Sequence, residues 1–230
     1  MTLRLRLRSL PVLALCVAAC GPAPAADAPP DDGWAGEVLP APLERPDFTL
    51  TDTGGRPYDF LAESEGKVAL LFFGYTYCPD VCPVHMANLA AVLDDLPPRV
   101  VRDWIEVVFV STDPERDTPE RIRSWLDGFH PGFVGLRGTP AEVHAVEDAL
   151  GLPRSLVEAG EDDAYFVGHA AQILAFGADG PARHAYPWGT RQRDWLRDLP
   201  RLVRETVPGA AEAWPRGLSV PTRPSAPPGG

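Results

Sequence analysis

The sequence is short of positive charge. Its 230 residues contain 21 lysines and arginines against 32 aspartates and glutamates, which gives a formal net charge of −11 and an isoelectric point near 4.8. A protein that binds nucleic acid needs a basic face for the phosphates, so this balance excludes that class of partner. The acidity suits a soluble exported domain, and the length suffices for one ordinary domain with tails.

The apolar run near the N-terminus is too short to cross a membrane as an ordinary helix. It covers residues 10–19 and follows three arginines among the first eight residues, which is the pattern of a signal peptide. Val17–Cys20 resembles a bacterial lipobox. We therefore expect a lipoprotein-type signal peptide over residues 1–19 and a lipid on Cys20 that holds the domain at the periplasmic side of the cell membrane. A plain cleaved signal peptide and an uncleaved anchor are the alternatives.

Cysteine is also scarce, with four in the whole chain. Cys16 would leave with the signal peptide and Cys20 would carry the lipid, so Cys78 and Cys82 are the free thiols of the mature protein. An exported protein meets an oxidising compartment, where paired thiols persist as a disulfide unless something reduces them or binds them.

The composition divides the chain into a tether, a domain and a tail. Residues 20–42 are rich in proline and alanine with no apolar period, which predicts a flexible tether. Residues 208–230 have the same character and are expected to be disordered. No internal repeat is visible, so we place the compact domain at residues 43–207.

The domain is organised around the stretch Lys67–Pro83. Residues 68–73 form an unbroken apolar run, which is typical of a strand buried on both faces. The two cysteines follow in a short loop, and apolar residues then recur at helical spacing from Met86 to Leu96. A thioredoxin-like domain presents sulfur chemistry on such a strand, loop and helix, but this loop has one residue more than the C-x-x-C motif.

The start of this helix predicts how the sulfurs behave. Asp80 is expected to cap the helix, and Pro83 lies in the first turn, where a missing N–H is harmless. Cys82 would then lie near the positive end of the helix dipole, which favours its thiolate. Two thiolates one turn apart can close as a disulfide or bind a soft metal such as copper(I), zinc or an iron–sulfur cluster. A metal would need a third ligand, for which histidine is the expected residue.

The remaining elements alternate between strands and helices, which predicts an α/β fold: a thioredoxin-like fold with a central mixed sheet flanked by helices and an N-terminal hairpin. Thr118-Pro119 and the capping box that begins at Thr139 mark two helix starts, and Pro200 should kink or interrupt the last helix. The expected elements are a hairpin over 46–60, strands at 104–111, 133–136, 171–176 and 183–186, and helices at 118–129, 139–151 and 190–206.

Five histidines compete for the place of third ligand. His85 is close to the cysteines in sequence, but its position on the helix points it along the helix surface. His169 stands beside a glycine, before the strand at 171–176, in a loop that lies against the cysteine loop in thioredoxin-like folds. The pattern alone favours a loop histidine with a backbone partner there. His130, His144 and His184 are expected to be solvated or satisfied by neighbours.

The six residues Cys78–Pro83, behind GKVALLFFGYTY, resemble the signature of the Sco (SenC) family of copper proteins that serve cytochrome c oxidase assembly. Three further stretches resemble the same family: PDFTLTDTGGRPYDF from Pro46, STDPERDTPE from Ser111 and YFVGHAAQILAFGADG from Tyr165. Together the similar stretches cover nearly all of the expected domain.

The resemblance implies one copper ion per chain, as Cu(I) or Cu(II), bound by Cys78, Cys82 and His169. It also implies a metallochaperone that delivers copper to, or reduces the thiols of, the copper A site on cytochrome c oxidase subunit II. Other periplasmic copper donors or thiol reductants would be its further partners. Two thiolates hold Cu(I), while an imidazole helps the site to accept Cu(II).

Two alternatives stay open beside the copper protein. The cysteine pair could cycle between dithiol and disulfide as a copper-independent thiol–disulfide oxidoreductase, or form a structural disulfide in a binding module. A zinc site is chemically allowed but has only three candidate ligands. The family usually has an aspartate where this chain has Gly168, and the loss of a carboxylate beside a ligand histidine can retune a metal site. Asp113, Arg116 and Asp117 match a family motif, but a turn and a helix start explain them locally.

Overall fold

The structure, a computed structural model, describes residues 33–160 and 165–214. Its strands are β1 (Glu37–Leu43), β2 (Thr49–Asp52), β3 (Pro57–Asp59), β4 (Val68–Gly74), β5 (Ile105–Ser111), β6 (Val134–Arg137), β7 (Leu156–Ala159), β8 (Tyr165–Gly168), β9 (Ile173–Phe176) and β10 (Ala182–Tyr186). Its helices are α1 (Phe60–Glu63), α2 (Val81–Asp94), α3 (Pro98–Trp104), α4 (Pro119–Asp127), α5 (Pro140–Ala149), α6 (Gln192–Thr206) and α7 (Ala210–Ala213).

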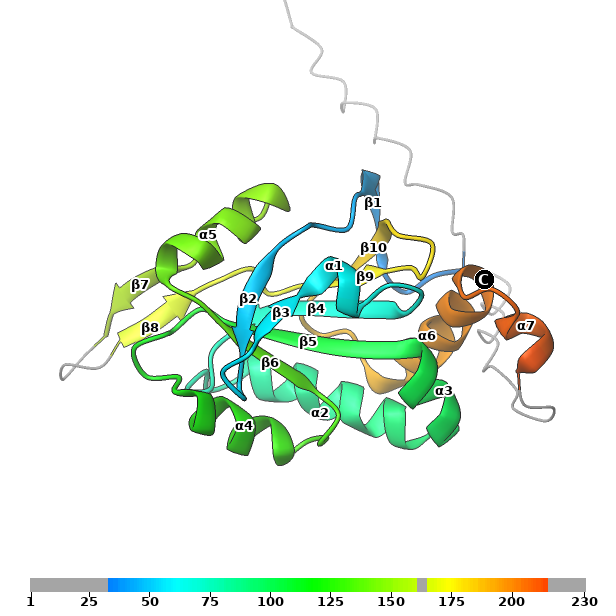
Figure 1. Ribbon diagram of the computed structural model, residues 1–230, viewed down its shortest axis with the longest axis horizontal. Helices are drawn as coiled ribbons and strands as arrows, with labels where there is room; N and C mark the ends of the chain where they lie inside the picture. Colours follow the sequence, from blue (N-terminus) through cyan, green and yellow to red (C-terminus); the bar gives the residue numbers. More distant parts are fainter. Residues whose placement is uncertain (1–32, 161–164, 215–230) are drawn as a thin grey trace, which may run out of the picture. The chain divides into compact units, whose positions relative to one another are not determined.

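Eight of the strands form one mixed sheet in the order β1-β10-β9-β4-β5-β6-β2-β3 (Figure 1). The three strands β4, β5 and β6 run parallel, and the other neighbours pair antiparallel. All seven residues of β4 are buried, as expected for a central strand covered on both faces. The predicted α/β fold with a central mixed sheet, flanking helices and an opening hairpin (β2–β3) is therefore confirmed.

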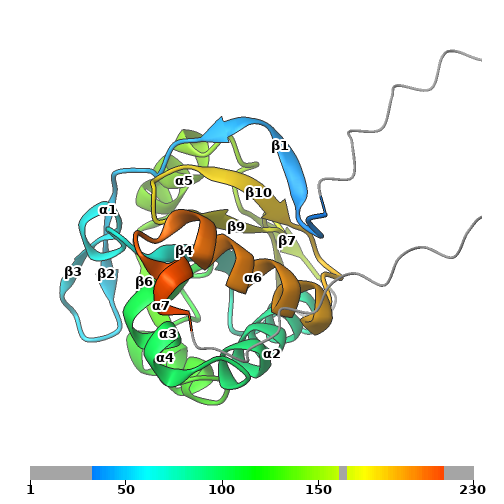
Figure 2. The same cartoon turned by 90° about the vertical axis from the view of Figure 1, so that its right-hand side faces the viewer.

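The helices divide between the two faces of the sheet. Helices α2, α4 and α6 pack on one face, and α1 and α5 pack on the other (Figures 1 and 2). Thr118 and Thr139 accept hydrogen bonds from the first turns of α4 and α5, so both predicted helix starts are confirmed. Helix α6 continues through Pro200 without interruption.

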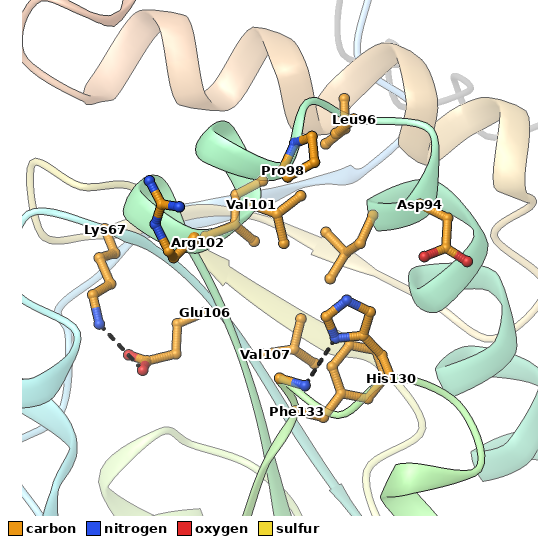
Figure 3. A pocket seen from close by; sticks show the side chains of 13 residues that line it. Lys67, Asp94, Leu96, Pro98, Val101, Arg102, Glu106, Val107, His130 and Phe133 are labelled. Carbon is orange, nitrogen blue, oxygen red and sulfur yellow. Dashed lines mark hydrogen bonds and ion pairs between the residues drawn. The ribbon is translucent and has the colours of Figure 1, made fainter.

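Helix α3 was not expected from the sequence. It walls a pocket of about 450 Å³ at the ends of β4 and β5 where these strands begin (Figure 3). The Lys67 ammonium lies 3.3 Å from the Glu106 carboxylate at its rim, and His130 Nδ1 accepts the Gly132 N–H beside Phe133. Because the cysteine loop follows the last residue of β4, this pocket and the cysteines lie at opposite ends of the central strands.

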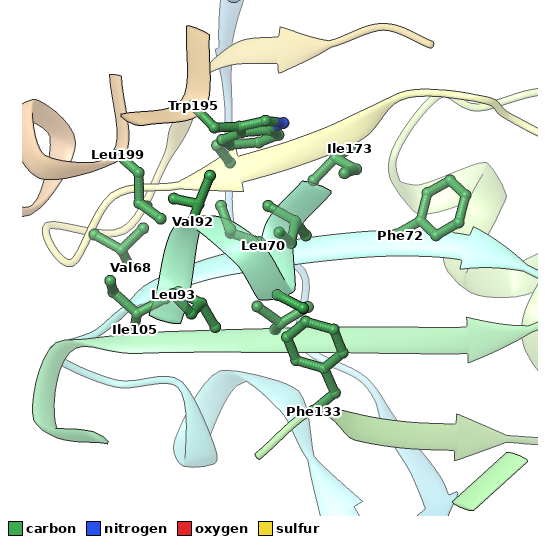
Figure 4. Close-up of a cluster of buried hydrophobic side chains, with 14 of the residues drawn as sticks. Val68, Leu70, Phe72, Val92, Leu93, Ile105, Phe133, Ile173, Trp195 and Leu199 are labelled. Carbon is green, nitrogen blue, oxygen red and sulfur yellow. The ribbon is translucent and has the colours of Figure 1, made fainter. Parts of the chain in front are cut away.

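Alternate side chains of β4 belong to two separate hydrophobic cores, one on each face of the sheet. Val68, Leu70 and Phe72 join the cluster beneath α2 and α6, which also contains Trp195 and Leu199 (Figure 4). The intervening residues of the strand join the cluster beneath α1 and α5. Successive side chains of a strand point to opposite faces, so one continuous apolar run supplies both cores.

The domain begins earlier than residue 43. Strand β1 pairs with β10, and the backbone N–H groups of Ala35 and Gly36 donate to the buried Asp198 carboxylate at 2.7 and 3.1 Å. The predicted tether over residues 20–42 was thus wrong for its last part. Most side chains of β1 are exposed, so this edge strand is held by backbone bonds and leaves no apolar period in the sequence. The predicted signal peptide, Cys20 and residues 20–32 lie outside the described residues.

The predicted disordered tail was also wrong at its start. Helix α7 follows α6, its Ala210 is buried, and the ring of Trp214 stacks on Trp104 at 6.4 Å between centroids. The remainder of the tail, residues 215–230, lies outside the described residues. In the described part of the chain, no helix has both the length and the apolar character needed to cross a membrane.

Candidate metal centre

The three predicted ligands come together at one end of the sheet. Cys78 lies in the loop after β4, Cys82 in the first turn of α2, and His169 directly after β8. Their sulfur and nitrogen atoms all lie within 4.8 Å of one another, and Cys82 Sγ lies 3.5 Å from His169 Nε2. Among residues 33–160 and 165–214, this is the one group of three or more histidine, cysteine or acidic side chains whose spacing suits a metal ion.

A glycine at the end of β4 makes room for the inner sulfur. Cys82 is completely buried, and a Cβ added to Gly74 would lie only 2.8 Å from its Sγ. The same Cβ would lie 3.0 Å from ring atoms of Phe72 and Phe109. Cys78 is partly exposed, so the pair has one sulfur inside the protein and one at the surface.

The outer sulfur, rather than the predicted aspartate, caps helix α2. Asp80 holds the N-cap position, but its side chain makes no capping bond. Instead, Cys78 Sγ accepts the backbone N–H of Cys82 at 3.5 Å. Asp80 therefore occupies the predicted N-cap position, but the predicted hydrogen bond from its side chain to the helix is absent.

This arrangement reverses the expected ionisation of the pair. Hydrogen bonds from the Cys82 thiol and from the backbone N–H groups of Cys82 and Asp80 lower the pKa of Cys78 to about 3, although its partial burial acts in the opposite direction. Burial, together with the adjacent Cys78 thiolate, raises the pKa of Cys82. The thiolate predicted at Cys82 is thus located on Cys78.

His169 presents a free nitrogen lone pair to the sulfurs. Its Nδ1 lies 2.9 Å from the carbonyl oxygen of Ala170, and a carbonyl can only accept, so Nδ1 carries the proton. Nε2 then has the free lone pair that could bind a metal, and it is the nitrogen that faces Cys82 Sγ. The rings of Phe72 and Tyr75 contact the imidazole edge-on at 5.8 Å and fix its plane. A backbone bond on the far nitrogen of a histidine is typical of metal ligands.

The other four histidines have different partners. His85 and His144 each place Nε2 beside a backbone carbonyl, at 2.9 and 3.0 Å. His130 accepts a backbone N–H, and the ring of His184 packs against Trp34 in a tilted arrangement at 4.5 Å between ring centroids. None of them belongs to the group of three described above.

A glutamate from the neighbouring strand occupies the space beside Gly168. A Cβ added to Gly168 would lie 2.8 Å from Glu158 Oε1, and Glu158 belongs to β7, which pairs with β8. A carboxylate is thus present next to the residue that precedes His169, although it comes from a different strand. Sequence reasoning missed this carboxylate because the β7–β8 pairing was not predicted.

Asp117 fixes the start of the cysteine loop. Its buried carboxylate accepts the Thr76 N–H at 3.0 Å, the Thr76 hydroxyl at 2.6 Å and the Ser111 hydroxyl at 2.6 Å. The loop after β4 is in this way tied to the end of β5. The structural interpretation of Asp117 from the sequence agrees with these contacts.

A layer of arginines and tyrosines covers the side of the loop. The Arg116 guanidinium lies 3.5 Å from the ring centre of Tyr165 and bonds to Asp113, which also accepts the Tyr165 hydroxyl at 2.8 Å. Arg121 lies 4.3 Å from the ring centre of the exposed Tyr77. These cation–π contacts hold β8, and therefore the residues before His169, against the loop that carries Cys78.

The fold and the three donors define a thioredoxin-like protein with a soft-metal site. A family model described as SCO1/SenC matches residues 37–204, and the chain belongs to the SCO1/SenC family. The mitochondrial SCO1 homolog of Homo sapiens is 37% identical over 140 residues, which are 60% of this chain and 46% of the human protein. The chain thus matches about half of that relative's length.

Two solved structures resemble the chain over nearly their whole length. The apo Sco1 protein of Thermus thermophilus is 33% identical with a TM-score of 0.64, and the match covers 74% of this chain and 96% of that one. The copper-bound ScoI of Bradyrhizobium japonicum is 32% identical with a TM-score of 0.61, and the match covers 69% of this chain and 99% of that one. The predicted family and fold are thereby confirmed.

Proposed function

We propose that this chain binds one copper ion through Cys78, Cys82 and His169 and serves cytochrome c oxidase assembly as a copper chaperone. The observation that carries the proposal is the convergence of two sulfurs and one imidazole nitrogen within 4.8 Å. Thiolates are the ligands that Cu(I) prefers, and an imidazole suits Cu(II) as well, so the donor set fits copper in both oxidation states. The structural relative from Bradyrhizobium japonicum holds copper, and the Sco family is described as one of cytochrome c oxidase assembly proteins.

The exposure of the ligands supports transfer to a partner. Cys78 is partly exposed while Cys82 is completely buried, so an incoming thiolate reaches the metal from the side of Cys78. Three protein ligands leave room for an acceptor's ligand, and ligand exchange can then proceed without release of the ion to water. The proposed acceptor is the copper A site of oxidase subunit II.

Exposed apolar side chains surround this end of the sheet and suit a protein partner. Tyr77 belongs to the cysteine loop, Val84 to the first turns of α2 and Phe166 to β8, and all three are more than 40% exposed. Trp188 is 53% exposed and comes two residues after the end of β10. The last residue of β10 pairs with the first residue of β9, so Trp188 follows the edge of the sheet at which β9 begins. Clustered exposed apolar residues around a reactive site are typical of a contact surface for another protein.

A membrane tether would bring the site to such a partner. The lipobox-like Val17–Cys20 supports a lipid on Cys20 and a periplasmic location at the cell membrane. Oxidase subunit II is a membrane-protein partner in this proposal, so a lipid anchor and a tether within residues 20–32 would keep the two on one surface.

A copper-independent thiol–disulfide oxidoreductase is the second candidate, and the low pKa of Cys78 favours it. The Cys78 thiolate would attack a disulfide of the partner to form a mixed disulfide and release one partner thiolate. Cys82 would then lose its proton, attack Cys78 and release the second partner thiolate. The partner gains two electrons and becomes a dithiol, and Cys78 and Cys82 become a disulfide.

A copper titration of the reduced chain, with His169→Ala beside it, tests the proposed function. We expect one copper per chain in the wild type and a thiolate-to-copper(II) charge-transfer band that is altered or lost in the variant. No copper uptake, together with a readily reduced Cys78–Cys82 disulfide, would contradict the copper chaperone and favour the oxidoreductase.

A further inference from the structure

His85 is a buried histidine that neither the core nor the ligand group explains. It lies on α2 one turn after Cys82, and only 1% of it is exposed. Its Nε2 lies 2.9 Å from the carbonyl oxygen of Ala171, two residues after His169. Helix α2 and the segment that carries His169 are therefore joined by a side-chain bond next to the site.

The direction of this bond fixes the protonation of the ring. A carbonyl oxygen only accepts, so Nε2 carries the proton and Nδ1 has a bare lone pair. Nδ1 is buried without a hydrogen-bond partner. Burial lowers the pKa of His85, which agrees with a neutral ring.

The unpartnered Nδ1 argues against a merely stabilising role. A buried acceptor without a partner is unfavourable, and a leucine or methionine at this position would fill the same helix face without that penalty. Local rules of this kind are broken chiefly at functional sites. The hydrogen bond to the Ala171 carbonyl is the one favourable polar contact of the His85 ring, and it is set against the unpartnered Nδ1.

The two carbonyls after His169 are each held by an imidazole. His169 Nδ1 donates to Ala170, and His85 Nε2 donates to Ala171. The ring of Phe72 contacts both imidazoles, with centroid distances of 5.0 Å to His85 and 5.8 Å to His169. The backbone that aims His169 is thus fixed to the same helix that carries Cys82.

We infer that His85 is a positioning residue that sets the separation of Cys82 Sγ and His169 Nε2 by tying Ala171 to helix α2. It acts through the backbone and does not ligate the metal. The identity of that metal rests on the proposed function, whereas the positioning of His169 in the metal-free protein does not. Partners that orient a ligand histidine commonly change metal affinity by roughly 10- to 100-fold when removed.

Three variants of the full chain test the inference. His85→Leu removes the donor, and His85→Gln restores an N–H at a similar reach. His144→Leu is the matched control, because His144 also sits on a helix and places Nε2 3.0 Å from a carbonyl, that of Ser155, outside the segment that follows His169. Thermal unfolding of each variant separates a general loss of stability from a local change.

The first readout needs no copper. In the metal-free wild type, nitrogen NMR of the His85 ring is expected to show the proton on Nε2, and the His169 ring is expected to give one set of resonances. His85→Leu should broaden or split the His169 resonances, while His85→Gln and His144→Leu leave them as in the wild type. Unchanged His169 resonances in His85→Leu would overturn the inference, even if that variant unfolds at a lower temperature.

The second readout uses copper. His85→Leu should shift the thiolate-to-copper(II) band and lower the Cu(II) affinity by roughly tenfold or more, while Cu(I), held by two thiolates, changes by less than about threefold. His85→Gln should recover the wild-type band. Equal losses for Cu(I) and Cu(II) would contradict the inference. Failure of the wild type to bind copper would contradict the proposed function instead, and the metal-free NMR would still decide the role of His85.

Discussion

The sulfur of Cys78 accepts the backbone N–H of Cys82 at 3.5 Å and so takes the place of a capping oxygen at the start of helix α2. The same bond joins the electrostatics of the helix end to the chemistry of the pair. A thiolate is a better acceptor than a thiol, so the helix is best capped when Cys78 is ionised. The partly exposed sulfur is thereby kept in the form that binds a soft metal or attacks a disulfide.

Alkylation of Cys78 should be nearly independent of pH across the neutral range. Its pKa is lowered to about 3, so the thiolate predominates at every pH well above that value. We expect the rate of iodoacetamide labelling of Cys78 in the reduced metal-free wild type, where Cys82 is completely buried, to be flat between about pH 5 and pH 8. A rate that rises tenfold per pH unit towards about 8.5 would show an ordinary thiol instead. In Cys78→Ser, the buried Cys82 should be labelled only as the chain unfolds.

Gly74→Ala should destabilise the domain and disturb the inner sulfur. The new methyl group would lie 2.8 Å from Cys82 Sγ and 3.0 Å from two phenylalanine rings, so the packed site has to shift. Overpacking of this kind costs about 1–3 kcal/mol, which urea unfolding can measure. In a Cys82→Ala background, where the closest contact is absent, the same substitution should cost less. An equal cost in both backgrounds would show that the sulfur is not the limiting contact.

The parts of the fold that the sequence predicted are those with a local cause. Strand β4 is an unbroken apolar run, and Thr118 and Thr139 cap their helices within the first turn. Strand β1 was missed because its side chains are exposed and its bonds are made by backbone to a strand about 140 residues away. A pattern of apolar residues cannot report such pairing.

The site shows the same division between local and distant causes. The spacing of Cys78 and Cys82 predicted a soft-metal or redox pair, but the choice of the ionised sulfur depended on loop geometry and was predicted wrongly. His169 was identified by its resemblance to the family motif, because a single loop histidine beside a glycine belongs to no recurring pattern of helix or strand. The contacts of His85 and Glu158 depend on the packing of α2 and on the β7–β8 pairing, which the sequence pattern did not reveal.

Removal of residues up to 43 should weaken the domain although they were expected to be a tether. A chain that begins at residue 44 loses β1 and two N–H donors to the buried Asp198, which keeps bonds from Tyr186 and Arg197. Each lost bond to a charged group is worth about 1.5–3 kcal/mol, so urea unfolding should shift clearly to lower denaturant. A chain that begins at Gly33 is the control and should match the full-length protein. Equal stability of the two shortened chains would contradict the role of β1.

Ionisation of Asp117 should lower stability as the pH rises. Burial raises the pKa of this carboxyl above its ordinary value of 3.8, against the hydrogen bonds from Ser111 and Thr76, which act in the opposite direction. The folded state therefore holds a proton that the unfolded state has lost, and this contribution is present below the unfolded pKa and disappears as the pH passes the folded one. Asparagine cannot titrate, so the stability of the wild type minus that of Asp117→Asn should fall between about pH 4 and about pH 7.

Unfolding in guanidinium at both pH values measures this difference, and the exposed Asp47→Asn provides the matched control. The control difference should stay flat, because the side chain of Asp47 is exposed to water. A rise of the Asp117 difference with pH would mean that the three hydrogen bonds outweigh burial. In that case the carboxylate, held by Thr76 and Ser111, would stabilise the cysteine loop in its charged form, and the anchor of the loop would strengthen rather than weaken towards neutral pH.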